Sequence, residues 1–99
     1  MAVTALLELQ FQPDKLDTAR EVVANILKDT RAFEGCLGVD VLIDQKDPGR
    51  WVIYERWESP EADAAYRKWR ATPEGAISEL GALLAGAPAL STYNLADDV

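Results

Sequence analysis

The chain has 99 residues, 48% of them apolar, which is enough for one hydrophobic core and too little for two. We therefore expect a single domain over residues 1–99. The 17 acidic residues outnumber the 10 basic ones, giving a net charge of −7, and the basic residues are scattered rather than gathered in a stripe. This composition disfavours nucleic acid and membranes as partners. The N-terminal residues lack the positive start of a signal peptide, so we expect a soluble cytoplasmic protein.

Histidine is absent and Cys36 is the only cysteine. An intrachain disulfide, a zinc site built on Cys and His, a nucleophile paired with His and a histidine-ligated heme are therefore excluded. No metal and no cofactor is predicted. A lone cysteine is typically a small core residue, and we prefer this interpretation of Cys36 to a reactive thiol.

The first third of the chain predicts a strand and a long helix. Residues 3–11 alternate apolar side chains along one face, which is typical of a strand. Pro13 and Asp14 predict a helix start with Asp14 as N-cap, and an apolar stripe at spacings of three and four continues to Phe33. Gly35 is the expected C-cap.

Two strands joined as a hairpin are predicted next. Residues 36–44 alternate, with Leu37 on the apolar face, and residues 50–57 form the outgoing strand after a turn at Pro48 and Gly49. The outgoing strand carries aromatic bulk on both faces. This pattern indicates a sheet that is covered on both sides.

The last third contains two similar helix starts. SPEA at residues 59–62 and TPEG at residues 72–75 each place a hydroxyl N-cap before Pro and Glu, which predicts two helices. The second helix is expected to bury apolar residues from Ile77 to Leu84, and residues 90–95 predict a final strand. The element order is that of an α+β, ferredoxin-like split β-α-β fold, an antiparallel sheet whose first and third strands are central.

Helices cover only one face of such a sheet, so the apolar groups on the other face need a partner. A second copy of the chain is the expected partner, since most soluble oligomers are symmetric homodimers. Tyr54 and Arg56 lie on this face and are predicted at the interface. Tyr93 and Asn94 fit either a pocket under the helices or the dimer seam.

The segment from Phe33 to Ala65 resembles the antibiotic biosynthesis monooxygenase family of dimeric α+β barrels. The resembling motifs are EGCLG, the DPGR hairpin, YERWES and the EA that opens the next helix. The resemblance implies oxidation of electron-rich aromatic quinols or anthrones by dioxygen without a metal or flavin. An ionised polycyclic phenol can itself pass an electron to dioxygen, so such a protein must hold a flat apolar substrate, stabilise its oxyanion and exclude water.

The resemblance also points to substrate-binding residues. Trp57 matches the tryptophan of the family's W-x-S motif and is expected to line the pocket, unless it only anchors the core. Ile53 stands where one family member has an asparagine. Trp69 and Arg70 follow on the next helix, where Arg67 and Arg70 either attract a phenolate or lie on a solvated helix face. We predict Trp57, Ile53, Trp69 and Arg70 as substrate-binding residues.

Two residues are candidates for proton transfer. Tyr66 stands where many family members have a histidine, and its hydroxyl can donate to a substrate oxygen unless it is only a core tyrosine. Glu55 shares a strand face with Trp57 and acts either as a general base or as the partner of a nearby arginine. Heme degradation, which relatives of the same fold perform, is not expected without an imidazole.

The leading prediction is a homodimeric, cofactor-independent monooxygenase that acts on a small hydrophobic aromatic quinol with dioxygen. The alternative is a non-catalytic dimeric module that binds an aromatic metabolite, which the missing histidine and asparagine favour. A purely structural role leaves the aromatic pocket unexplained.

Overall fold

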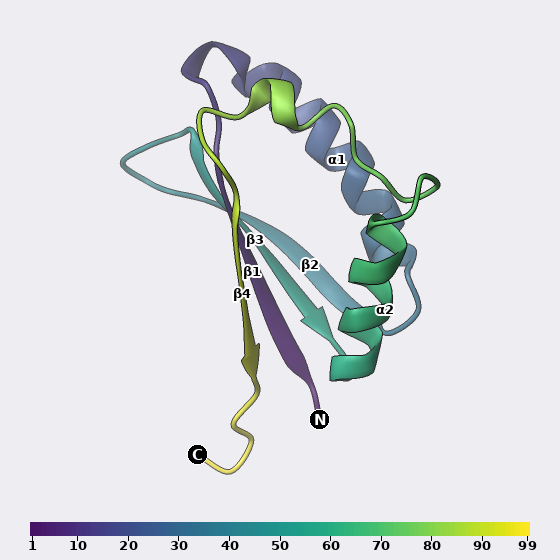
Figure 1. Cartoon of the computed structure of the whole chain (residues 1–99). Helices are drawn as coiled ribbons and strands as arrows, with labels where there is room; N and C mark the ends of the chain where they lie inside the picture. The colour runs from purple at the N-terminus through teal and green to yellow at the C-terminus, as the bar shows by residue number, and fades with distance from the viewer.

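One antiparallel sheet with two helices on a single face makes up the chain (Figure 1). The computed structural model describes residues 1–99. Its elements are β1 (Val3–Gln10), α1 (Leu16–Ala32), β2 (Cys36–Ile43), β3 (Arg50–Trp57), α2 (Pro60–Arg70) and β4 (Ala89–Asn94), with 3₁₀ turns at Pro13–Lys15 and Gly81–Leu83. The sheet order is β2-β3-β1-β4 with every neighbouring pair antiparallel. The predicted ferredoxin-like fold with central first and third strands is confirmed.

Strand β3, one of the two central strands, supplies an unbroken row of buried side chains to the inner face of the sheet. Its alternate residues point under the helices and are all at most 2% exposed: Trp51, Ile53, Glu55 and Trp57. Three of them are large apolar residues, as the period of two predicts for a strand with one buried face. Glu55 is the exception, a carboxylate in the middle of that row.

The start of α1 differs from the prediction, because Asp14 does not cap the helix. A 3₁₀ turn precedes α1, and the residue before this turn is Gln12 in an extended conformation. The Gln12 backbone N–H donates to the Leu83 carbonyl at 2.9 Å, and its side-chain amide donates to the carbonyls of Ala82 and Leu84 at 3.1 Å. Gln12 thus ties the helix start to the segment before β4. Asp14 lies in the first turn, where its charge suits the helix dipole.

The end of α1 follows the prediction at Gly35. This glycine has φ of +90°, a region that other residues rarely adopt, and the chain turns there into β2. A Cβ at this position would also collide with the side chain of Ala62 in α2. The close approach fixes how α2 sits beside the end of α1.

A bulge at the start of β2 overturns the expected alternation there. Cys36 pairs with Trp57 and Gly38 with Arg56, so Leu37 is an extra residue in the strand. Leu37 is 57% exposed rather than on the buried face. The hydrophobic core consists of two clusters, one that includes Leu27 and Ile53 and one that includes Trp57 and Tyr66. Cys36 is half-buried and packs against both, which agrees with its interpretation as a small core residue.

The second helix predicted for residues 72–84 is wrong. Thr72 does make the cap-like contact, because its hydroxyl accepts from the Gly75 N–H at 3.3 Å, but only a turn follows. The Gly75 carbonyl, which a continuing helix would need, instead accepts from the Arg70 guanidinium at 3.2 Å. Glycines at positions 75 and 81 each weaken a helix by about 1 kcal/mol relative to alanine. Only the 3₁₀ turn at Gly81–Leu83 remains, with Leu83 buried.

The face of the sheet away from the helices has no cover within the chain (Figure 1). At its centre Leu6 on β1 lies opposite Tyr54 on β3, and the exposed side chains of Leu42 and Tyr93 lie on the outer strands. We call this surface the open face. Neither helix is both long and apolar enough to cross a membrane.

Candidate functional site

A cavity of about 180 Å³ lies between the inner face of the sheet and the helices. We call it the inner cavity. Its walls are mostly aliphatic and come from β1, β3, α1 and the segment after α2: Leu7, Leu9, Val23, Ile26, Leu27, Ile53, Ile77 and Leu80. Its polar lining residues are Glu55, Tyr66, Arg67 and Arg70. An apolar hollow with a few polar groups is the usual form of a small-molecule site.

Four of the six predicted site residues line the inner cavity. Ile53 and Glu55 reach it from β3, and Tyr66 and Arg70 reach it from successive turns of α2. The i, i+4 spacing on α2 places the last two on one helix face. Their functional roles remain predictions.

Glu55 is held in place by two donors. One oxygen, Oε1, accepts from the Arg67 guanidinium at 2.7 Å and from the Trp57 indole N–H at 3.1 Å. The expected pairing with a nearby arginine is therefore confirmed. Arg67 also lies 3.1 Å from Oδ1 of Asp63, an ionic contact without hydrogen-bond geometry. No side chain donates to the other oxygen, Oε2, which leaves it available to a ligand.

Tyr66 belongs to a second network that sequence reasoning did not foresee. Its hydroxyl lies 2.7 Å from the hydroxyl of Thr30 on α1 and accepts from Nε of Arg70 at 2.8 Å. Arg70 also donates to Thr30 at 3.2 Å and to the Ile26 carbonyl at 3.1 Å. The only sign in the sequence that Thr30 takes part in such a network is that it is a hydroxyl residue within the apolar stripe of α1.

Arg70 has no acidic partner. Its guanidinium donates only to carbonyls and hydroxyls, and it stacks over Trp69 at 4.7 Å and over Tyr66 at 5.1 Å from the ring centroids. Its positive charge is therefore not neutralised by the chain. A guanidinium in this position can attract the oxyanion of a bound phenol.

Trp57 and Trp69 do not line the inner cavity. Trp57 is fully buried and packs against Phe33 and Tyr66, with ring centroids 6.1 and 4.9 Å away. It contacts the lining of the cavity through this packing on Tyr66 and through its hydrogen bond to Glu55. Trp69 is half-buried, packs against Phe33 and Tyr66 with ring centroids 5.6 and 6.2 Å away, and lies beneath the Arg70 guanidinium. Both indoles therefore contact residues that line the cavity without lining it themselves.

Tyr93 and Asn94 also lie away from the inner cavity. Together with Asp63 they border a separate hollow beside β4. Tyr93 is 54% exposed and, lying opposite Thr4, belongs to the open face. The sequence allowed either a pocket under the helices or the dimer seam, and the position of Tyr93 on the open face fits the second of these. No group of three or more metal-ligating side chains is found in the structure.

Comparison with known proteins agrees with this architecture. The pattern that defines the antibiotic biosynthesis monooxygenase family matches residues 2–75, so the chain belongs to this family. No curated protein matches the chain. Family membership supports a monooxygenase at the level of the family.

Solved structures share the fold at low sequence identity. Rv0793 from Mycobacterium tuberculosis is 23% identical over 99% of this chain and 98% of that one, with a TM-score of 0.81. A candidate antibiotic biosynthesis monooxygenase from Nitrosomonas europaea is 20% identical over 97% and 99% of the two chains, with a TM-score of 0.81. Another, from Caulobacter crescentus, is 21% identical over 95% and 89%, with a TM-score of 0.82. These similarities establish the fold.

Proposed function

We propose that the protein is a homodimeric, cofactor-independent monooxygenase that oxidises a small hydrophobic aromatic quinol or anthrone with dioxygen. The observation that carries this proposal is the inner cavity, where aliphatic walls surround one carboxylate and one unpaired guanidinium. Membership of a monooxygenase family supports the reaction class.

The size of the inner cavity limits the substrate. An aliphatic cavity of about 150 Å³ is known to bind benzene. The 180 Å³ measured here therefore accommodates a single ring. A wider polycycle requires Ile77 and Leu80 to move, and both lie in the irregular segment between α2 and β4.

The proposed reaction balances without an added reductant. A substrate methylene beside a phenol loses a proton, and the resulting anion passes one electron to dioxygen. The two radicals combine to a hydroperoxide, which loses water to leave a carbonyl. Overall, one CH₂ and one O₂ become one C=O and one H₂O.

Three of the four polar residues that line the inner cavity have a proposed role in this reaction. Glu55 takes the proton at Oε2, the oxygen without a partner. Arg70 binds the substrate oxyanion, and the aliphatic walls exclude water. The Tyr66 hydroxyl is engaged by Thr30 and Arg70, so we assign it to positioning Arg70 and not to donating a proton.

Oxygen consumption by metal-free protein tests this function, both with a single-ring quinol, which fits the inner cavity, and with a model anthrone, which requires Ile77 and Leu80 to move. We expect the wild type to consume oxygen faster than buffer and Glu55→Gln to lose about a hundredfold of that rate, as is typical for a general base. Glu58→Gln removes an exposed carboxylate outside the cavity and should keep the rate. Circular dichroism checks that both variants fold. No acceleration by wild type over a panel of anthrones and quinols would contradict the proposal.

A non-catalytic binding module is the second candidate. It is favoured because Glu55 and Tyr66, the two candidate proton-transfer residues, both already have structural partners. This function predicts quenching of tryptophan fluorescence by an aromatic ligand without oxygen consumption. Turnover in air would reject it, and the absence of binding would reject both candidates.

A further inference from the structure

Half of the arginines have no acidic partner, although the chain has 17 acidic residues. Three are in ion pairs within 4.0 Å: Arg50 with Glu8, Arg56 with Asp40, and Arg67 with Glu55 and Asp63. The other three are Arg20, Arg31 and Arg70. Arg70 lines the inner cavity, and the remaining two line a different hollow.

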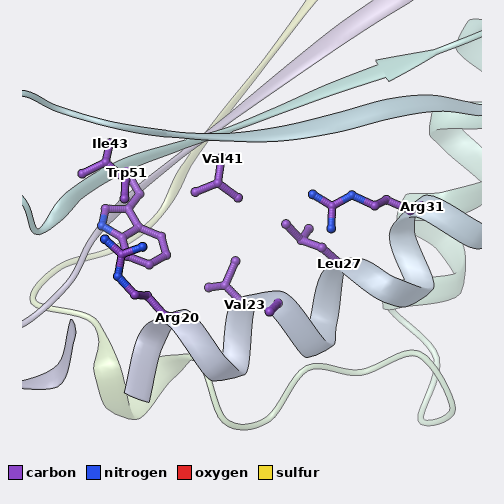
Figure 2. A pocket seen from close by; sticks show the side chains of 8 residues that line it. Arg20, Val23, Leu27, Arg31, Val41, Ile43 and Trp51 are labelled. Carbon is purple, nitrogen blue, oxygen red and sulfur yellow. The ribbon is translucent and has the colours of Figure 1, made fainter. Parts of the chain in front are cut away.

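This second hollow is a groove of about 230 Å³ between α1 and β2 (Figure 2). We call it the outer groove. Val23 and Leu27 form its helix side, and Val41 on β2 and Trp51 on β3 form its sheet side. Six of its eight lining residues are apolar, and none is acidic.

The two arginines stand at opposite ends of the outer groove. They are eleven residues apart on α1, three helical turns or about 16 Å, so they share one face of the helix. Figure 2 shows both guanidinium groups on the side of α1 that faces the sheet. Arg31 is anchored by donating to the Val39 carbonyl at 3.0 Å, and Arg20 lies over the Trp51 ring at 5.8 Å. Most of their N–H donors remain free for a ligand.

We propose that the outer groove binds a small amphipathic organic anion. An aromatic body of one or two rings packs against Val41 and Ile43, the half-buried apolar residues of the groove. Its carboxylate or sulfonate is bound by Arg31, and Arg20 at the other end of the groove adds attraction at longer range. The argument is charge complementarity: two cations that an acidic chain leaves unpaired border an apolar groove without a carboxylate. This site is distinct from the inner cavity and does not depend on the proposed monooxygenase activity.

The test uses 8-anilinonaphthalene-1-sulfonate as the probe and NMR of the ¹⁵N-labelled protein as the readout. We expect the probe to shift the amide signals of Val41 and Ile43, which border the outer groove. Arg31→Gln should raise its dissociation constant about tenfold, the loss expected for one charge-assisted contact. Arg50→Gln is the matched control, because it removes the same charge at a site away from the groove.

A neutral probe separates charge from packing. N-phenyl-1-naphthylamine has similar rings without the sulfonate and should bind Arg31→Gln as well as it binds the wild type. The proposal is overturned if the sulfonate probe shifts only residues of the inner cavity such as Ile77 and Leu80. It is also overturned if Arg31→Gln and Arg50→Gln weaken binding equally, or if the neutral probe is weakened as much as the charged one. Arg20→Gln is a second variant and should raise the dissociation constant less than Arg31→Gln does, because Arg20 lies at the far end of the groove.

Discussion

Two buried polar networks meet beside the inner cavity, one centred on Glu55 and one on Tyr66. A carboxylate that is 2% exposed is costly unless it is paired, and Arg67 and Trp57 provide that pairing. The networks therefore serve stability as well as any chemistry. Substitutions that remove one partner should be visible in the stability of the protein.

Arg67→Met should lower the free energy of unfolding by about 3 kcal/mol, because it leaves the buried carboxylate of Glu55 uncompensated. Urea unfolding followed by circular dichroism measures this loss. Lys68→Met is the control, since the neighbouring side chain is exposed and makes no ion pair. Equal stability of the two variants would show that the ion pair does not hold Glu55.

Cys36 gives the protein a pH dependence in the alkaline range. Burial raises the pKa of its thiol above the ordinary value of 9.0. The folded state thus keeps its proton longer than the unfolded state, and this contribution to stability is lost as the pH rises through the raised pKa. We expect the stability difference between wild type and Cys36→Ala to shrink as the pH rises above 9.0. Urea unfolding at several pH values measures the difference, and a constant value would contradict the prediction.

The sequence predicts which side chains share a face of a strand or helix better than it predicts which side chains hydrogen-bond to one another. Strand alternation correctly placed Glu55 on the same face as Trp57, whereas for Arg70 the sequence left open whether it attracts a ligand or lies on a solvated helix face. It could not reveal that Thr30 joins the Tyr66 network, because that contact links residues 36 positions apart. Nor could it show that Trp57 stands behind Glu55, because the depth of a side chain depends on how the layers pack.

The helix elements differ in how strongly they are capped. At the start of α2 the Ser59 hydroxyl accepts from the Ala62 N–H at 3.1 Å, and acidic residues occupy the first turn. This favourable start agrees with the prediction from SPEA. The same pattern at TPEG failed because the following carbonyl is taken by Arg70 and glycines interrupt the segment. A local cap motif predicts where a helix can begin, and tertiary contacts decide whether it continues.

Ser59→Ala should lower the free energy of unfolding by about 1 kcal/mol, the usual value of an N-cap hydrogen bond. Thermal unfolding followed at a helix-sensitive wavelength gives the measurement. Ser78→Ala serves as the reference, since Ser78 is exposed and its side chain makes no hydrogen bond. A loss of the same size in both variants would argue against the capping role.

In the molecule as a whole, the open face is the side of the sheet that no helix covers. Tyr54 sits at its centre between Asp40 and Leu6, and Arg56 lies over the Tyr54 ring at 5.2 Å while pairing with Asp40. A sheet face with this much apolar and aromatic surface is typical of an interface. We propose that a second copy covers it, as the sequence analysis predicts.

Sedimentation at micromolar concentration tests this dimer. The wild type should sediment at twice the chain mass of 10.9 kDa, and Tyr54→Asp should sediment at that mass because a buried charge disfavours association. Ala64→Asp introduces the same charge on the exposed side of α2 and should remain dimeric. A monomeric wild type would reject the interface.

Val23 and Leu27 border both hollows of the molecule, the outer groove on one side and the inner cavity on the other. These two side chains are therefore part of the wall of both spaces. Val23→Ala would remove part of that shared wall and enlarge the outer groove and the inner cavity together.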